Sequence, residues 1–474
     1  MQGIDIGLDR VVAATGGQVI RRAAERFSAA VIDGRAAKEG ALFFAVKGER
    51  FDGHDFVLQA IAAGATGAVV ERGRGAALKI DSATVIEVDD PVRALGQLAR
   101  AHREAMSELK VVAITGSNGK TTTKDMTAEI LAARAGAGAV LKTEGNLNNH
   151  LGVPLTLLRL TGEHRYAVVE MGMSALGEIE YLTGLAEPDV AVVVSVAAVH
   201  LETLGTVENV ARAKGEIWKG LKPGGFAVLP IDEPRLLPYV AEVPAERRLT
   251  FGPRALLPTV GYDDVRQGPR GLRFRLHLEK MTSRTGAAAE VALIGAHHAS
   301  NAAAAAAAAR ALDVGEGSIL EGLSEVRPAK HRGQLVAAGD RTVLDDCYNA
   351  SPLSTRAALD ALSAIAPAGK KRVAVLGDML ELGEASARLH EEIGAYASER
   401  VDELIAFGPL SRHILGGARA KLPGERLFHT DDPGAAAARA FAVTGAGDVI
   451  LVKGSRGMRL ERVIDGILAR TKVG

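Results

Sequence analysis

The segment 115–122 has the residue types and the spacing of a loop that binds nucleotide phosphates. It follows the apolar run 110–114 and precedes a stretch of helical character, so its backbone N–H groups would meet phosphate at a helix N-terminus. The Lys side chain would reach the terminal phosphates, and the hydroxyl after it could hold Mg²⁺. The residues expected to contact nucleotide here are Thr115, Gly116, Ser117, Asn118, Gly119, Lys120, Thr121 and Thr122.

The loop has the form TGxxGKT, which differs from the usual GxxxxGKT pattern because Ile114 stands where the first glycine would be. A glycine-rich turn without a ligand is the alternative interpretation. The order of strand, loop, Lys-Thr pair and helix favours a nucleotide site.

Two further residues that could bind a metal ion follow apolar runs. Glu170 ends the run Tyr166–Glu170, and His200 lies just beyond the run 189–196. Ligands of open parallel sheets gather at the carboxyl ends of the strands, so both side chains could join Thr121 in holding two Mg²⁺ ions. The alternatives are a strand-end surface carboxylate and a structural histidine.

Apolar runs alternate with helical stretches in the central part of the chain, which predicts a parallel sheet covered by helices on both faces. The more polar stretch 252–290 is expected to be rich in strands. It leads to the alanine run 302–309, which predicts a helix that packs closely on a sheet.

Turn signals and composition changes divide the chain into three α/β domains. The polar segment 102–108 suggests a linker, and the segment 327–335 marks a second boundary before further strand-and-loop units. We therefore expect a small N-terminal domain over residues 1–106, a central domain over residues 107–326 and a C-terminal domain over residues 327–474.

Composition excludes several classes of protein. Lys plus Arg and Asp plus Glu both number 57, which argues against binding of nucleic acid or membrane surfaces through bulk charge. No apolar stretch reaches the roughly 18 residues of a membrane span. The single cysteine, Cys347, and the lack of a signal-peptide pattern lead us to expect a cytoplasmic protein without membrane insertion.

An ordered set of motifs resembles the Mur ligase family over essentially the whole chain. Beside TGSNGKT, the matching segments are NLNNHLGVPLTLLRL (146–160), AVVEMG (167–172), HLETLG (200–205), ARAKGEI (211–217), LDDCYNASP (344–352), VLGDMLELG (375–383) and LVKGSRG (451–457). The resemblance implies an N-terminal UDP-binding domain, a central ATPase domain with a parallel sheet, and a C-terminal Rossmann-like domain.

The resemblance also implies a reaction and its partners. A peptide carboxylate is activated by ATP as an acyl phosphate, which an amine then attacks. The motifs are most similar to those of family members that join D-alanyl-D-alanine to UDP-N-acetylmuramoyl-tripeptide. We expect the chain to act as a monomer, and the third residue of the tripeptide could be diaminopimelate or lysine.

Family similarity assigns metal roles to Glu170 and His200 and adds a third residue. Relatives carry a carbamylated lysine at the position that matches Lys214, where the added anion helps to hold Mg²⁺. An exposed helix lysine is the alternative. Carbamylation requires a neutral amine, and therefore partial burial. With Lys120 and His200, Lys214 completes the expected catalytic set.

Nucleotide contacts outside the loop also follow from the resemblance. Asn301 matches a residue that reads adenine, which suits an amide that both donates and accepts hydrogen bonds; a helix cap is the alternative. Arg332 and Asp346 match residues that engage phosphate and ribose. His298, His331 and Cys347 depart from the usual Asn, Gly and Ser at their positions, and Cys347 is interpreted as a small core thiol.

Substrate contacts are expected in three places. Asp33 and Arg35 lie in a segment that resembles the uridine site, although Gly34 replaces the usual serine. A polar asparagine cluster could face the muramoyl peptide, or could form an ordinary turn. A loop after the last apolar run could bind a peptide carboxylate, or could be a solvated basic turn. These last two groups are Asn146, Asn148, Asn149, Lys453, Ser455 and Arg456.

Three other functions share part of this pattern. A ligase that adds a diamino acid to the UDP-linked dipeptide would use the same ATP chemistry, but its Asp-Asn-Pro-Arg motif is absent. A folyl-polyglutamate synthase fits the NLNN and KGSRG segments poorly. A nucleotide-binding regulator would not need the metal set of Glu170, His200 and Lys214.

Overall fold

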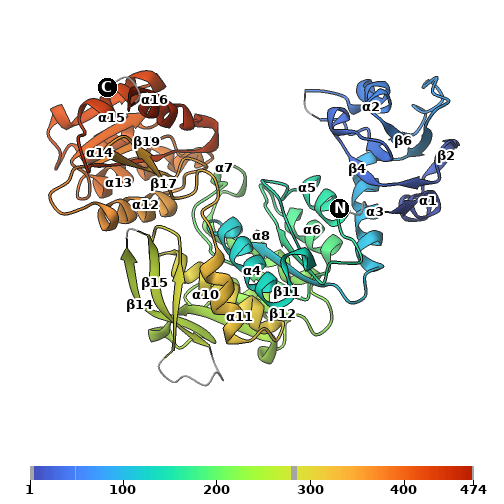
Figure 1. Ribbon diagram of the computed structural model, residues 1–474, viewed down its shortest axis with the longest axis horizontal. Helices are drawn as coiled ribbons and strands as arrows, with labels where there is room; N and C mark the ends of the chain where they lie inside the picture. Colours follow the sequence, from blue (N-terminus) through green and yellow to red (C-terminus); the bar gives the residue numbers. More distant parts are fainter. Residues whose placement is uncertain (1–4, 49, 269, 279–285, 472–474) are drawn as a thin grey trace.

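The computed structural model describes residues 5–48, 50–268, 270–278 and 286–471. Three α/β units follow one another along the chain, and the central unit lies between the other two (Figure 1). No helix in these ranges is both long and apolar enough to cross a membrane.

The first unit contains a five-stranded sheet in the order β2-β7-β6-β5-β4, parallel except for the pairing of β2 with β7. A short antiparallel pair, β1 with β3, lies beside it. Its elements are β1 (Ile6–Gly7), α1 (Leu8–Thr15), β2 (Gln18–Arg21), β3 (Arg26–Phe27), β4 (Ala29–Val31), β5 (Ala41–Phe44), α2 (Val57–Ala62), β6 (Ala65–Glu71), β7 (Thr84–Val88) and α3 (Pro91–Glu104).

The central unit contains a nine-stranded sheet in the order β16-β15-β14-β13-β12-β11-β8-β10-β9. The strands are parallel from β9 to β14, and β15 and β16 extend the edge as antiparallel strands. The strands are β8 (Lys110–Thr115), β9 (Val140–Lys142), β10 (Tyr166–Glu170), β11 (Val190–Val193), β12 (Phe226–Pro230), β13 (Arg248–Pro253), β14 (Val260–Gly268), β15 (Gly271–Leu278) and β16 (Ala287–Val291).

Helices cover this central sheet on both sides. The α-helices are α4 (Lys120–Ala135), α5 (Gly152–Leu157), α6 (Glu178–Ala186), α7 (Leu201–Leu204), α8 (Val207–Gly215), α9 (Leu237–Val240), α10 (His298–Ala311) and α11 (Glu316–Glu325). The alanine side chains of α10 from 302 to 309 are all fully buried. Their small size lets α10 lie against α4 and the strands β13 and β14.

The C-terminal unit contains a six-stranded sheet in the order β17-β18-β22-β19-β20-β21, antiparallel only between β17 and β18. Its elements are β17 (Gln334–Ala338), β18 (Arg341–Asp345), α12 (Pro352–Ile365), β19 (Arg372–Gly377), α13 (Ser386–Ala397), β20 (Glu403–Phe407), α14 (Arg412–Ala418), β21 (Leu427–Thr430), α15 (Pro433–Ala442), β22 (Val449–Lys453) and α16 (Glu461–Thr471).

The predicted α/β class is confirmed, and the apolar runs expected to be strands correspond to β8, β10 and β11. The segment that contains the ARAKGEI motif forms α8 followed by a 3-10 helix, Glu216–Gly220. The strand-rich stretch 252–290 contains β14, β15 and most of β16, while residues 269 and 279–285 lie outside the described ranges.

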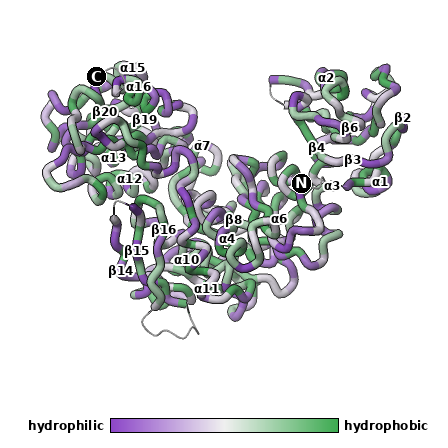
Figure 2. The backbone as a smooth tube through the Cα atoms, in the orientation of Figure 1, coloured by the Kyte–Doolittle hydropathy of each residue, from purple (hydrophilic) through white to green (hydrophobic). Residues whose placement is uncertain are grey.

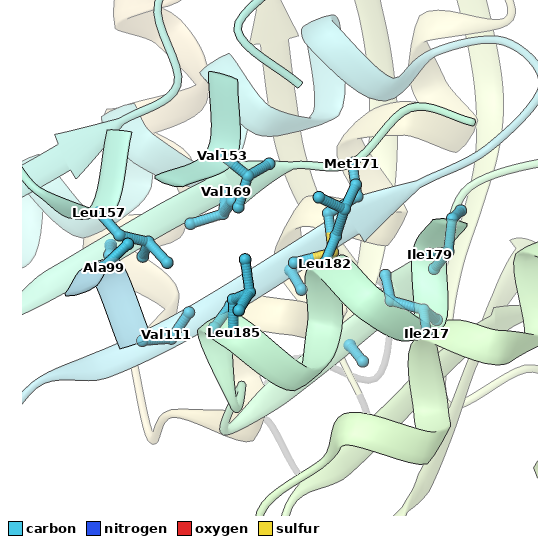
Figure 3. Close-up of a cluster of buried hydrophobic side chains, with 14 of the residues drawn as sticks. Ala99, Val111, Val153, Leu157, Val169, Met171, Ile179, Leu182, Leu185 and Ile217 are labelled. Carbon is cyan, nitrogen blue, oxygen red and sulfur yellow. The ribbon is translucent and has the colours of Figure 1, made fainter. Parts of the chain in front are cut away.

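One hydrophobic core joins the first two units. Its buried side chains include Leu95, Leu98 and Ala99 of α3, together with Val111 of β8 and Ile217. Figure 3 shows Ala99 beside Leu157 and Val111, at the end of this cluster. Hydrophobic residues follow the sheets and their covering helices in all three units (Figure 2). The C-terminal sheet has its own clusters on its two faces.

Candidate functional site

The phosphate loop lies between the end of β8 and the start of α4, at the carboxyl edge of the central sheet. Gly119 has φ 82°, and a Cβ there would lie 2.5 Å from Oδ1 of Asn301, so only glycine fits. The backbone N–H of Asn118 donates to the Ser195 hydroxyl at 2.9 Å, which ties the loop to the segment after β11. Lys120 Nζ donates to the Gly116 carbonyl at 2.7 Å and so lies over the loop.

Glu170 lies beside the loop because its strand, β10, pairs directly with β8. Its carboxylate is 2% exposed and accepts two hydrogen bonds at 2.8 Å, from the Thr121 hydroxyl and from the Asn148 amide. A buried carboxylate beside a hydroxyl offers the hard oxygen ligands that Mg²⁺ takes in proteins. The structure thus brings three of the predicted residues into direct contact.

Two lysine side chains complete a group of charges at this edge. Burial lowers the pKa of Lys120, with Glu170 opposing the effect and Arg332 adding to it. Burial also lowers the pKa of Lys214 well below its usual range, and the positive charge of Lys120 lowers it further. Lys214 is 2% exposed on α8, and within the described ranges its amine has no hydrogen-bond or ion-pair partner.

His200 lies where the central unit meets the C-terminal unit. Its Nδ1 is 2.5 Å from Oε2 of Glu381, which comes from the loop after β19, and this contact lowers the pKa of Glu381. Both residues have left-handed backbones, with φ of 52° and 63°. If Nδ1 donates its proton to the carboxylate, Nε2 of the ring is left free to accept a ligand.

Asn301, which was predicted to read adenine, lies on α10 directly against the phosphate loop at Gly119. Its amide is 5% exposed and lies 3.2 Å from Nδ1 of His298, the residue that stands where an asparagine was expected. The side chain therefore contacts the phosphate loop and a neighbouring ring at once.

Arg332 and Asp346 both belong to the C-terminal unit. The Arg332 guanidinium lies 3.9 Å from the centre of the Tyr348 ring, and its charge acts on Lys120 across the two units. Asp346 forms an ion pair of 2.6 Å with Lys453, whose side chain is 3% exposed. The Lys453 amine also donates to the Asn349 carbonyl at 3.0 Å. The pairing joins two residues that were predicted to act on different ligands.

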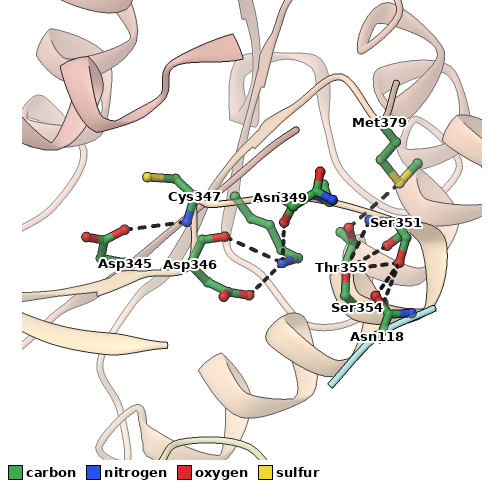
Figure 4. Close-up of polar contacts among 11 residues, drawn as sticks. Asn118, Asp345, Asp346, Cys347, Asn349, Ser351, Ser354, Thr355 and Met379 are labelled. Atoms are coloured by element: carbon green, nitrogen blue, oxygen red, sulfur yellow. Dashed lines mark hydrogen bonds and ion pairs between the residues drawn. The ribbon is translucent and has the colours of Figure 1, made fainter. Parts of the chain in front are cut away.

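A direct hydrogen bond links the phosphate loop to the C-terminal unit. The Ser351 hydroxyl donates to Oδ1 of Asn118 at 3.0 Å (Figure 4). Ser351 also caps α12, because its hydroxyl accepts from the Ser354 N–H in a reciprocal capping box. The side-chain nitrogen of Asn118, Nδ2, is buried and has no partner among the residues that the structure describes, so it is available to a ligand at the loop.

The asparagine cluster divides into two roles. Asn148 contacts Glu170, as described above, and its carbonyl accepts from Gly172 at 2.8 Å. The Asn149 side-chain oxygen accepts from the Gly152 N–H at 2.9 Å, at the first residue of α5, and the carbonyl of Asn146 accepts from the Asn148 N–H. A cavity of about 260 Å³ adjoins the cluster, lined by Asn149, His150, Gly172, Leu176, Gly177, Glu178, Tyr181 and Leu182.

Asp33 and Arg35 lie in the first unit, away from the phosphate loop. They pair with each other at 2.8 Å, and this hydrogen bonding lowers the pKa of Asp33 to about 2. Asp33 also accepts from the Arg35 N–H, which begins the 3-10 helix Gly34–Ala36. The Arg35 side chain is 80% exposed and can reach a ligand.

The segment at the end of β22 is more buried than an exposed basic turn. Ser455 is 4% exposed, and its hydroxyl accepts from the Leu380 N–H at 2.9 Å. Arg456 is exposed and pairs with Glu461 at 3.3 Å. Of the three residues predicted there, only Arg456 presents its charge to solvent.

Sequence reasoning missed two residues at the site, Glu381 and Ser351. Both lie in segments that had been singled out, VLGDMLELG and LDDCYNASP, at the ends of C-terminal strands. Their position after strands was the available signal. Their contacts with His200 and Asn118 depend on how two units pack, which the sequence pattern does not describe.

Three family models match the chain. Residues 27–103 match the Mur ligase family catalytic domain, residues 114–309 match the Mur ligase middle domain, and residues 331–456 match the Mur ligase glutamate ligase domain. These matches follow one another along the chain in the order of the three structural units.

Similar proteins cover nearly the whole chain. The UDP-N-acetylmuramoyl-tripeptide--D-alanyl-D-alanine ligase of Bacillus subtilis is 37% identical, over 92% of this chain and 92% of its own. A crystal structure of MurF from Acinetobacter baumannii has a TM-score of 0.89 at 32% identity, covering 99% and 100% of the two chains. MurF ligase from Thermotoga maritima in complex with ADP has a TM-score of 0.80 at 30% identity, covering 94% and 98%.

Proposed function

The chain belongs to the Mur ligase family, and from this we infer that it is the ATP-dependent ligase that joins D-alanyl-D-alanine to UDP-N-acetylmuramoyl-tripeptide. The observation that carries this function is the match to ligases of that name over nearly the full length of both chains. The reaction forms ADP, phosphate and the UDP-linked pentapeptide used in peptidoglycan synthesis.

We propose a division of labour among three domains. Residues 1–106 would hold the UDP-sugar, residues 107–326 would bind ATP, and residues 327–474 would complete the site from the other side. The contacts of Ser351 with Asn118 and of Glu381 with His200 support this arrangement, because both join the last domain to the ATP edge of the central sheet.

The proposed reaction has two steps. The terminal carboxylate of the tripeptide attacks the γ-phosphorus of ATP, which gives an acyl phosphate and ADP. The amine of D-alanyl-D-alanine then attacks the acyl carbon, so that an amide forms and phosphate and a proton leave. Lys120 would stay beside the transferred phosphoryl group through the first step and neutralise part of its charge.

Magnesium fits the residues at the edge of the sheet. Thr121, Glu170 and His200 would hold the ions, and the buried carboxylate already accepts from the Thr121 hydroxyl. Bound Mg²⁺ would supply charge screening between ATP and the attacking carboxylate. Asn148 would keep the Glu170 carboxylate in place through its 2.8 Å hydrogen bond, and Glu381 would orient the His200 ring.

We propose that Lys214 is carbamylated. The reaction needs a neutral amine, which attacks CO₂ to form a carbamate and release a proton. Burial and the nearby Lys120 charge lower the pKa of Lys214, which favours the neutral amine. No described group forms a hydrogen bond or an ion pair with this amine. The carbamate would place a negative charge beside the magnesium ligands.

The nucleotide and substrate contacts are assigned by position. Asn301 would read adenine from α10, while Arg332 and Asp346 would reach phosphate and ribose from the C-terminal domain. The cavity beside Asn149, next to the asparagine cluster, would bind part of the tripeptide. The remaining proposed substrate contacts are Asp33, Arg35, Asn146, Asn148, Lys453, Ser455 and Arg456.

An oxygen-transfer experiment tests the proposed reaction. UDP-N-acetylmuramoyl-tripeptide labelled with ¹⁸O in its terminal carboxylate is incubated with ATP, Mg²⁺ and D-alanyl-D-alanine. Attack of that carboxylate on ATP predicts labelled oxygen in the released phosphate and a pentapeptide product of the expected mass. Unlabelled phosphate with normal product formation would show that no acyl phosphate forms.

Replacing Glu381 tests the contact across the two domains. We expect Glu381→Gln to lower kcat about 10–100-fold, because the neutral amide holds the His200 ring less firmly for the metal. Raising Mg²⁺ should recover part of this loss. The measurement is ligation rate against Mg²⁺ concentration, with exposed Glu384→Gln as the matched control. An unchanged magnesium dependence in Glu381→Gln would contradict the positioning role.

Replacing Ser351 tests the link to the phosphate loop. Ser351→Ala removes both the bond to Asn118 and the cap of α12, whereas Ser354→Ala weakens only the capping box. We expect kcat/KM for ATP to fall about five- to tenfold more in Ser351→Ala than in Ser354→Ala, as one hydrogen bond is lost. Equal rates in the two variants would leave the link without a role in ATP use.

A further inference from the structure

A histidine, an aspartate and a cysteine lie close together at the start of the C-terminal unit, apart from the proposed magnesium ligands. Nδ1 of His331 is 2.8 Å from Oδ2 of Asp345, and the Asp345 carboxylate also accepts from the backbone N–H of Cys347 at 3.4 Å. One ligand atom from each of the three side chains lies within 4.8 Å of the others. Figure 4 shows Asp345 and the Cys347 sulfur on the same side of the strand end.

The backbone holds these three groups together. Asp345 is the last residue of β18, and Cys347 follows two residues later. The segment of His331 is held to this strand end, because the Tyr348 N–H donates to the His331 carbonyl at 3.0 Å. His331 has φ 63°, a left-handed conformation that costs a non-glycine residue about 1 kcal/mol, so its side chain is placed at the expense of backbone strain.

The charge around the cluster favours a cation. Asp345 is 3% exposed and Cys347 is fully buried. The negative charges of Asp345, Glu461 and Asp346 all act on the buried Cys347 side chain. Oε2 of Glu461 is buried without a hydrogen-bond partner among the described residues. A divalent ion would offset these negative charges.

We propose that His331, Asp345 and Cys347 bind one borderline transition-metal ion, for which Zn²⁺ is the best chemical fit. Thiolate, imidazole and carboxylate are the ligands of zinc, whereas magnesium takes oxygen ligands and keeps its waters. On binding, the thiol proton leaves to solvent. The proton between Nδ1 and Oδ2 moves to Nε2 of the neutral ring, so that Nδ1 and the carboxylate oxygen both face the metal.

The position of the site links it to nucleotide binding. His331 precedes Arg332, and Asp346 lies between the other two ligands. A bound ion would therefore change the positions of both proposed nucleotide contacts. We therefore expect low concentrations of Zn²⁺ to raise the KM for ATP. This consequence alone rests on the proposed function; metal binding itself can be measured without any substrate.

Cobalt is the probe for the site, because a thiolate bound to Co²⁺ gives a charge-transfer band that oxygen ligands do not. The full-length protein is stripped of metals and titrated with Co²⁺ in the presence of excess Mg²⁺, which occupies the oxygen sites. Cys347 is the only cysteine of the chain, so any thiolate band comes from it. Competition with Zn²⁺ then gives the zinc affinity.

Three variants complete the test. Cys347→Ser should abolish the band, and His331→Asn, which tolerates a left-handed backbone, should weaken Co²⁺ binding at least about tenfold. His413→Asn is the matched control, since this exposed histidine lies in the same unit. Absence of the band in the unmodified protein, or an undiminished band and affinity in His331→Asn, would overturn the proposal.

Discussion

Lys120→Ala is expected to lower the rate of ligation by about a thousandfold or more. The lysine places a positive charge over the phosphate loop, where Nζ contacts the Gly116 carbonyl at 2.7 Å. Removing one preorganised charge from a phosphoryl-transfer site has an effect of this size. Because Lys120 is half-buried near Lys214, its removal relieves repulsion and should not unfold the protein.

The measurement is phosphate release with saturating substrates, together with thermal unfolding of each variant. Lys219→Ala is the control, because Lys219 is an exposed lysine of the same unit and pairs with Glu180 on the surface. We expect near-normal rates in Lys219→Ala. Near-normal rates in Lys120→Ala as well would mean that segment 115–122 does not act on the transferred phosphate.

Lys214→Ala is expected to lower activity about a hundredfold or more, and a short carboxylic acid should restore part of it. If the lysine is carbamylated, the substitution removes an anion from the metal site and leaves a space that a small carboxylate can enter. A neutral lysine would leave no such requirement for an anion. Rescue therefore separates a carbamate from an ordinary buried lysine.

Two readouts test this prediction. Activity of Lys214→Ala is measured against added acetate, with Lys120→Ala as the variant that acetate should not rescue. Nuclear magnetic resonance of the unmodified protein in ¹³CO₂ should show one carbamate carbon that disappears in Lys214→Ala. Full activity of Lys214→Ala without acetate, or no carbamate signal in the unmodified protein, would contradict a role for carbamylated Lys214 in the metal site.

The phosphate loop and the carboxylate beside it could be predicted from the sequence because both lie at the ends of strands. Segment 115–122 and Glu170 each end a run of apolar residues, and parallel strands that pair place such ends together. The fold class followed for the same reason. Lys214 could be singled out only by resemblance, since nothing in the spacing of a helical stretch shows that its amine is buried.

Contacts between units could not be predicted in this way. The pairs His200 with Glu381 and Asn118 with Ser351 join residues of the central unit to residues of the C-terminal unit. Local periodicity describes which face of an element is buried, but it does not describe how two finished units meet. The ion pair between Lys453 and Asp346 was missed for a related reason, because it joins the ends of strands that are far apart in sequence.

Phosphate release by the purified protein with ATP and Mg²⁺, leaving out one acceptor at a time, tests the proposed function most directly. We predict that release requires both UDP-N-acetylmuramoyl-tripeptide and D-alanyl-D-alanine, and stops when either is left out. Release that instead requires UDP-N-acetylmuramoyl-dipeptide and a free diamino acid would contradict the assigned substrates and leave only the ATP site. Release that is independent of every acceptor would contradict a ligase.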